Sequence, residues 1–197
     1  MKILVLSDTH GKLDKVYRVC EKLNNIDLII HCGDYIRDAH TLEDTLGITV
    51  AAIKGNCDGC CSSSHKDSQG GDYAVVSTDG GNILVTHGHN EGAGYSLDRL
   101  KYKALEENCV AVVYGHTHVA EVRQIDEPAA PGGSLWFINP GSLPLPRDNS
   151  GGSYGIIRSE EDRFDATIVY YSTIMGSSRK GNTAGYVSSL LNYSDRF

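Results

Sequence analysis

The chain of 197 residues has the length of one domain of ordinary size. With 40% hydrophobic and 22% charged residues it can bury a real core, which excludes a disordered chain. The formal net charge of −7 disfavours stable binding to nucleic acid or to an anionic membrane surface. It does not exclude a small phosphate ester, because bound metal ions can reverse the local field.

Short apolar runs alternate with helical patterns in the first part of the chain. Buried strands are predicted at residues 3–6, 28–30 and 50–53. Apolar side chains at steps of three and four predict a helix over residues 13–23, and a second helix over residues 38–46 ends at Gly47. Strands that alternate with helices at this spacing are typical of a parallel α/β sheet.

The second part of the chain is richer in strands. Residues 59–72 are predicted to form a loop, and residues 96–107 a helix with Leu97, Leu100 and Leu105 facing inward. A hairpin is predicted from the strands at residues 73–77 and 83–86. Further strands are predicted at residues 110–113, 119–125, 135–138, 154–157 and 164–171. Two packed sheets with helices outside would accommodate both parts.

The domain organisation and the setting follow from composition. Residues 1–174 are predicted to form one domain, and residues 175–197 a polar tail or partner-contacting extension. The six cysteines lie mostly inside or beside apolar runs without the spacing of a disulfide framework, which indicates reduced thiols and a cytoplasmic protein. No signal peptide is predicted, and no apolar run approaches the roughly 18 residues that a membrane span needs.

Five of the predicted strands are each followed directly by residues of metal-ligand type. The motifs are Ser7-Asp8-Thr9-His10, His31-Cys32-Gly33-Asp34, Lys54-Gly55-Asn56-Cys57-Asp58, His87-Gly88-His89 and Gly115-His116-Thr117-His118. Binding sites of open α/β sheets lie beyond the carboxyl ends of the strands. We therefore expect the five loops to converge on one crevice. The glycine in or beside each motif permits the close approach that a tight metal loop needs.

The residue types and their spacing favour metal binding. Asp8 and His10 are two residues apart, as are His116 and His118, and in a strand this spacing points both side chains to one side. Each pair is therefore predicted to hold one ion or to straddle two. A single such residue after a strand is more often a cap or a turn former, but five in register are not explained that way. The ligand types suit Mn, Fe, Zn, Ni or Co better than Ca or Mg, and seven candidates exceed one tetrahedral site.

The order and spacing of the motifs resemble those of the calcineurin-like metallophosphoesterases over residues 8–118. The short chain, Gly55-Asn56-Cys57-Asp58 and Asn139-Pro140-Gly141-Ser142 look like the small bacterial and archaeal phosphodiesterases of the YfcE type. That subgroup is itself similar to a retromer subunit that keeps the fold. The resemblance implies an α/β protein with a four-layer αββα sandwich, in which two mixed β-sheets are flanked by helices.

The resemblance also implies a role for each candidate residue. One ion would be held by Asp8, His10, Asp34 and His118, and the other by Asp34, Asn56, His87 and His116. Asp34 would bridge the ions, and Asp34, Asn56 and His87 would take part in catalysis. A hydroxide that bridges two divalent ions would attack the phosphorus of a small phosphodiester. Mn²⁺ is the expected metal, with Ni²⁺, Zn²⁺, Fe or Co²⁺ as alternatives.

The sequence departs from the wider family directly after Asn56. Many members carry a histidine there that helps to protonate the leaving oxygen, whereas this chain has Cys57, a poorer acid with an ordinary pKa of about 8.5. His89 is expected to support the second ion or the substrate rather than to ligate directly, and His31, His40 and Arg147 are expected to be ordinary residues.

Two other functions stay open. One is a phosphomonoesterase or nucleotidase, and the other is a catalytically weak scaffold that resembles the retromer subunit. The presence of all seven ligand positions favours the enzyme, because a pure scaffold has little use for them. The sequence leaves a homo-oligomer open and does not identify the natural substrate.

Overall fold

The computed structural model describes residues 1–59 and 72–174. The predicted polar tail and nearly all of the predicted loop at residues 59–72 lie outside the described residues. In chain order the elements are β1 (Lys2–Leu6), α1 (Asp14–Lys22), β2 (Leu28–His31), α2 (Ile36–Leu46), β3 (Val50–Ala52), the 3₁₀ turn η1 (Asn56–Asp58), β4 (Tyr73–Thr78), β5 (Gly81–Thr86), α3 (Asp98–Glu106), β6 (Cys109–Val113), β7 (Ala120–Asp126), η2 (Pro131–Gly133), β8 (Ser134–Pro140), β9 (Ser153–Glu160), β10 (Arg163–Tyr170) and α4 (Tyr171–Ile174).

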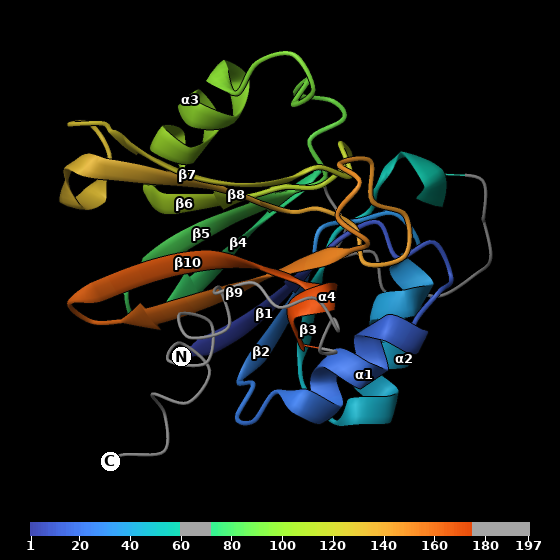
Figure 1. The fold of residues 1–197 in the computed structure, drawn as a ribbon. Helices are drawn as coiled ribbons and strands as arrows, with labels where there is room; N and C mark the ends of the chain where they lie inside the picture. Colours follow the sequence, from blue (N-terminus) through green and yellow to red (C-terminus); the bar gives the residue numbers. More distant parts are fainter. Residues whose placement is uncertain (60–71, 175–197) are drawn as a thin grey trace.

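The strands form two mixed sheets of five strands each. Their orders are β10-β9-β1-β2-β3 and β4-β5-β6-β8-β7. In the first sheet β1, β2 and β3 are parallel, and in the second β5, β6 and β8 are parallel. Helices α1 and α2 lie on the outer side of the first sheet and α3 lies on the outer side of the second (Figure 1). The predicted four-layer αββα sandwich is therefore confirmed.

Strand β1 shows why the central strands appear in the sequence as continuous apolar runs. Ile3 and Val5 belong to the core between the two sheets, whereas Leu4 and Leu6 pack against the helical layer. All four side chains are buried, since a strand covered on both faces has no solvent side. A third cluster fills the space between α3 and the second sheet, around Leu100 and Phe137.

The predicted elements differ from the observed ones mainly at their ends. The predicted helix over residues 38–46 begins earlier, at Ile36, because Asp58 binds the backbone N–H of Ile36 at 2.7 Å. The last predicted strand ends at Tyr170, where α4 begins. Of the three leucines expected to face inward from α3, only Leu100 is fully buried.

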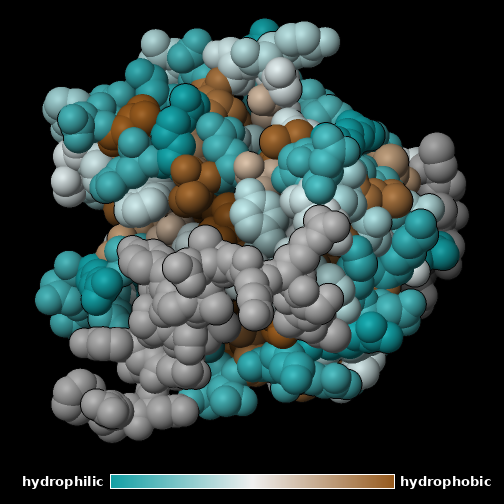
Figure 2. Space-filling view, viewed as in Figure 1, coloured by the Kyte–Doolittle hydropathy of each residue, from teal (hydrophilic) through white to brown (hydrophobic). Residues whose placement is uncertain are grey.

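The surface carries mostly hydrophilic residues on the face shown in Figure 2. In the same view, the described part of this face is mainly hydrophilic, with small groups of hydrophobic residues toward its centre (Figure 2). Among the helices in the described ranges, none combines the length and the apolar character that crossing a bilayer requires.

Candidate metal centre

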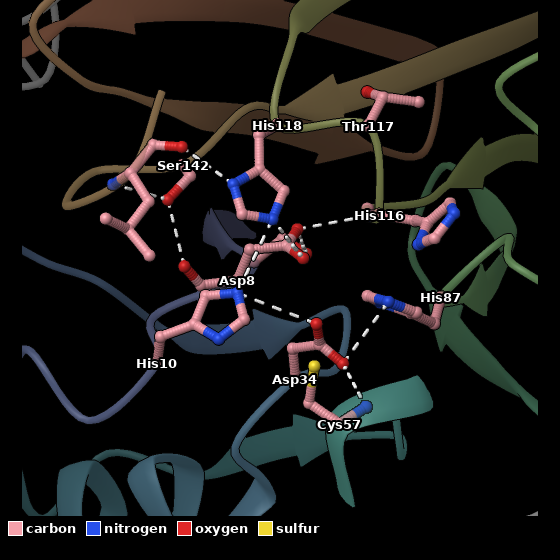
Figure 3. A network of polar contacts seen from close by, with 12 residues as sticks. Asp8, His10, Asp34, Cys57, His87, His116, Thr117, His118 and Ser142 are labelled. Carbon is pink, nitrogen blue, oxygen red and sulfur yellow. Dashed lines mark hydrogen bonds and ion pairs between the residues drawn. The ribbon is translucent and has the colours of Figure 1, made fainter. Parts of the chain in front are cut away.

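Five loops meet at one end of the two packed sheets. They follow β1, β2 and β3 of the first sheet and β5 and β6 of the second. All five strands run parallel to neighbours in their own sheet, so their carboxyl ends lie at a common edge. Figure 3 shows residues of all five motifs close together, with the Asp8, His10, Asp34, His87 and His118 side chains turned toward one another. The expectation that the loops converge agrees with this arrangement.

The first cluster, called here the Asp8 group, brings together two carboxylates and two imidazoles. Its members are Asp8, His10, Asp34 and His118, and one ligand atom from each lies within 4.8 Å of all the others. The Nε2 atom of His118 is 3.2 Å from Asp8 Oδ1 and 3.4 Å from Nε2 of His10. This is the set that the family resemblance assigns to one ion.

The second cluster, called here the Asn56 group, is centred on an amide oxygen. Its members are Asn56, His87 and His116. Asn56 Oδ1 lies 3.1 Å from Nε2 of His87 and 3.1 Å from Nδ1 of His116. Asn56 is exposed and His116 is half-buried, whereas Asp8 is fully buried, so the more open side of the site is that of the Asn56 group.

Asp34 lies between the two groups and offers one oxygen to each. Its Oδ2 atom is 3.6 Å from Nε2 of His10, and its Oδ1 atom is 3.4 Å from Nε2 of His87 (Figure 3). The carboxylate is 3% exposed, and the backbone N–H of Cys57 donates to Oδ1 at 2.9 Å. The Asp34 carboxylate therefore faces both groups.

The hydrogen bonds of the imidazoles leave lone pairs directed into the site. Nδ1 of His87 donates to the carbonyl of Cys32 at 2.7 Å, and Nδ1 of His118 donates to the carbonyl of Leu145 at 2.7 Å. In the neutral rings Nε2 is then an acceptor, and it faces other acceptors on Asp34, Asn56 or Asp8. Asp8 Oδ1 is also buried, and among the described residues only a protonated His118 is placed to donate to it. Converging acceptors without donors fit bound cations, so the residues present suit divalent metal ions.

The ionisation of the site points the same way. The hydrogen bond with Asp8 raises the pKa of His118. Burial alone would raise the pKa of Asp8, but the bond with His118 and the nearby His87 and Ser7 outweigh it, and the Asp8 pKa is lowered. Burial and then His87 lower the pKa of His116, which keeps that ring neutral and able to ligate. The Asp8 carboxylate therefore favours a positive charge beside it, which a protonated His118 supplies.

The backbone that presents the ligands is not a strand, which corrects one expectation. Asp8, His10, His116 and His118 all have positive φ, between 46° and 69°. Each pair therefore converges through left-handed turns after β1 and β6, not through the alternation of an extended strand. Asp and His tolerate this conformation better than most residues. Asp8 and His10 join the same group, whereas His116 and His118 face different groups.

Two glycines are required by the close approach of the loops. A Cβ atom added to Gly55 would overlap Oδ1 and the backbone nitrogen of Asp34. One added to Gly115 would overlap Oγ of Ser7 and lie 2.9 Å from Asp8 Oδ2. Both positions have to be free of a side chain if the motifs are to meet, as expected from the sequence.

Several residues that support the ligands were not singled out from the sequence. Ser7 Oγ donates to Asp8 Oδ2 at 2.5 Å, and Ser142 Oγ donates to the carbonyl of Asp8 at 2.9 Å. Asn139 Nδ2 donates to the carbonyl of Gly115 at 2.9 Å, which ties the end of β8 to the loop after β6. A sixth strand end therefore takes part, and its only signal in the sequence was the Asn-Pro-Gly-Ser turn after a buried run.

The remaining sequence candidates lie around the site or away from it. The His89 ring lies 5.2 Å from that of His87 and 6.1 Å from that of His116, centroid to centroid. Arg147 is exposed, and its backbone N–H donates to the carbonyl of His118 at 3.0 Å. His40 is exposed on α2, whereas His31 is fully buried, and burial lowers its pKa.

Comparison with known proteins identifies the family. The model of the calcineurin-like phosphoesterase superfamily domain matches residues 1–162. The chain belongs to this superfamily. The phosphoesterase is 33% identical to the probable metallophosphoesterase YsnB of Bacillus subtilis (strain 168) over 172 residues. The aligned part covers 87% of this chain and 90% of YsnB. It is 28% identical over 185 residues to the phosphodiesterase YfcE of Escherichia coli (strain K12), covering 81% and 89% of the two chains. The predicted family resemblance is confirmed.

Solved structures agree with the fold of the phosphoesterase. A protein of Streptococcus pneumoniae TIGR4 described as a predicted phosphoesterase superposes with a TM-score of 0.66 at 25% identity, covering 87% of this chain and 90% of that one. Wild-type Vps29 of Entamoeba histolytica, solved with zinc, gives a TM-score of 0.62 at 17% identity, covering 87% and 99%. At that identity the second likeness concerns the fold alone. The chain is thus a metal-dependent phosphoesterase by family, with a candidate metal group in the expected place.

Proposed function

We propose that this phosphoesterase is a phosphodiesterase that acts on small phosphodiesters with two divalent ions, Mn²⁺ first among them. One ion is assigned to the Asp8 group and the other to the Asn56 group, with Asp34 shared. The observation that carries the proposal is the position of Asp34, whose two oxygens face His10 on one side and His87 on the other. A carboxylate that faces imidazoles on both sides can be shared by two ions.

The bound ions would supply the nucleophile for an in-line displacement and offset the charge of the phosphoryl oxygens. The protein's part is to hold the ligands. Asn56 Nδ2 donates to the Cys57 sulfur at 3.5 Å, which leaves Oδ1 to face His87 and His116. The more open side of the Asn56 group is where a small ester would enter, and the half-buried His89 lies beside it.

The setting that we propose is cytoplasmic. Of the cysteines in residues 1–59 and 72–174, none is in a disulfide, and Cys20, Cys32, Cys57 and Cys109 are free thiols. Free thiols are typical of a reducing compartment.

A metal-by-substrate screen tests the proposed activity. We expect no hydrolysis by chelator-treated protein, recovery with Mn²⁺, and a higher kcat/KM for an aryl phosphodiester than for the corresponding aryl monoester. Preference for the monoester would favour a phosphomonoesterase. Failure to hydrolyse either ester with Mn²⁺, Ni²⁺, Zn²⁺ or Co²⁺, in protein that has bound both ions, would favour the scaffold.

Cys57→Ala is expected to change aryl phosphodiester kcat/KM by less than about tenfold, because an aryl oxide with a conjugate acid pKa of about 10 leaves with little acid help. Alkyl esters need a proton donor, and a positioned one is typically worth about 10²–10⁴-fold. Cys57→His should therefore help an alkyl diester more than an aryl one. Relative kcat/KM for the two esters across the three proteins is the measurement. A collapse of aryl turnover in Cys57→Ala, with fold and metal content intact, would assign the thiol a chemical role.

A further inference from the structure

A buried carboxylate on α2 binds the loop that carries two of the candidate ligands. Asp38 is 7% exposed, and none of the motifs includes it. Its Oδ2 atom accepts a hydrogen bond from Thr9 Oγ1 at 2.6 Å and another from the backbone N–H of Gly11 at 2.8 Å. Thr9 and Gly11 are the two neighbours of His10, and Thr9 directly follows Asp8. One oxygen atom therefore fixes the loop on both sides of a ligand.

The side chain of Asp38 binds outside its own helix. Asp38 lies in the first turn of α2, three residues after Tyr35, where a carboxylate commonly bonds back to the start of its own helix. Here Asp58 Oδ1 accepts the hydrogen bond from the N–H of Ile36 at 2.7 Å. The Oδ2 atom of Asp38 is directed away from its helix, toward the loop after β1.

His31 completes the network from β2. It is fully buried, and its Nε2 atom lies 2.9 Å from Thr9 Oγ1. The Thr9 hydroxyl has one proton, which it donates to the Asp38 carboxylate, so Nε2–H of His31 donates to Thr9. Each hydrogen bond then has one direction, from His31 to Thr9 to Asp38. Buried hydrogen bonds that run in one direction favour one rotamer of each of these side chains.

The loop needs such support because its conformation is costly. Asp8 and His10 have φ of 54° and 46°, a region that residues with a Cβ atom adopt less readily than glycine. Such residues persist where the surrounding structure over-determines them. The Asp38 network is the surrounding structure on the α2 side of the loop.

We propose that Asp38, acting through Thr9 and with His31 behind it, is a positioning residue that sets the metal affinity of the Asp8 group. The inference rests on the proposed two-ion function, because it assigns the network to one of the two ions. Outer partners of metal ligands are typically worth about 10–100-fold in affinity. The Asn56 group has no contact with Thr9 or Asp38 among those described and should be unaffected.

Co²⁺ titration of the purified chain, followed by calorimetry and visible absorption, tests the assignment. Asp38→Ala and Thr9→Val are each expected to raise the dissociation constant of one ion by about 10–100-fold and to leave the other within about threefold. Thr9→Ser keeps the hydroxyl and should restore binding to within about threefold of the wild type. The affected ion should be the one that His10→Ala loses and that His116→Ala keeps.

Asp44→Asn, an exposed acid on the same helix, is the matched control and should change neither constant. Unchanged binding of both ions in Asp38→Ala and Thr9→Val, or an equal loss of both, would overturn the proposal. If Asp38→Ala does not fold, Asp38→Asn and Thr9→Val carry the test. A wild type that binds one ion defeats the two-ion function, but the variants then still report on Asp38 through that ion.

Discussion

Asp34→Asn is expected to lower phosphodiester kcat by about 10³-fold, which corresponds to roughly 4 kcal/mol, more than any other single ligand substitution. The reason is the shared position of the carboxylate, with Oδ2 toward His10 and Oδ1 toward His87. The amide replaces one oxygen by a donor and removes the negative charge between two cations, which weakens both sites and increases the repulsion between the ions. The measurement is kcat at saturating Mn²⁺, together with the metal content of the variant.

The matched controls for Asp34→Asn are substitutions of residues that belong to one group only, such as His10→Ala and His116→Ala. Each of these should leave one ion in place and retain more activity. Near-normal turnover of Asp34→Asn at saturating metal would show that Asp34 is not the bridge.

Gly55→Ala is expected to lower activity by at least about 10²-fold, because a displacement of about 1 Å in a catalytic group has an effect of that size. The added Cβ would overlap Oδ1 and the backbone nitrogen of Asp34, so the carboxylate has to move. Overpacking of this kind also costs typically about 1–3 kcal/mol of stability. The backbone of Gly55, with φ −101° and ψ −177°, accepts alanine, so the effect is one of contact alone.

Gly59→Ala is the matched control for Gly55→Ala. It lies at the end of the same turn, has φ −73°, and has no atom of the described residues within 4 Å of an added Cβ. Metal content, thermal unfolding and kcat are measured for both variants. Equal behaviour of the two would mean that the contact between Gly55 and Asp34 is not needed in the working enzyme.

Much of the fold could be predicted because its strands are covered on both faces. The apolar runs that form β1, β2 and β6 are continuous, and each strand is followed within three residues by a residue of metal-ligand type. The order of strands in the sheets could not be derived in this way. Ile3 pairs with Leu28 on one side and with Ile157 on the other. The local sequence around Ile3 does not predict a pairing with a residue as distant in the chain as Ile157. The family resemblance supplied the two mixed sheets and the helical layers, and the order of the strands was not predicted.

Part of the candidate site could also be predicted from the sequence, and part could not. Ligand-type residues directly after strands could be recognised, and the structure brings the seven together, although their role as ligands stays a prediction. Their left-handed backbone could not be read from the spacing. Asp38 and Asp58 were missed because an acid in the first turn of a helix or in a turn has an ordinary explanation. Only the packing of α2 against the loops shows what they bind.

The central claim is that one chain holds two metal ions across Asp34, and metal stoichiometry tests it most directly. Protein freed of metal, incubated with Mn²⁺ and separated from unbound ion is analysed for manganese per chain. Two ions per chain are expected for the wild type, and one for His116→Ala, which leaves the Asp8 group complete. A wild-type value that stays at one or zero at saturating Mn²⁺ would contradict the account.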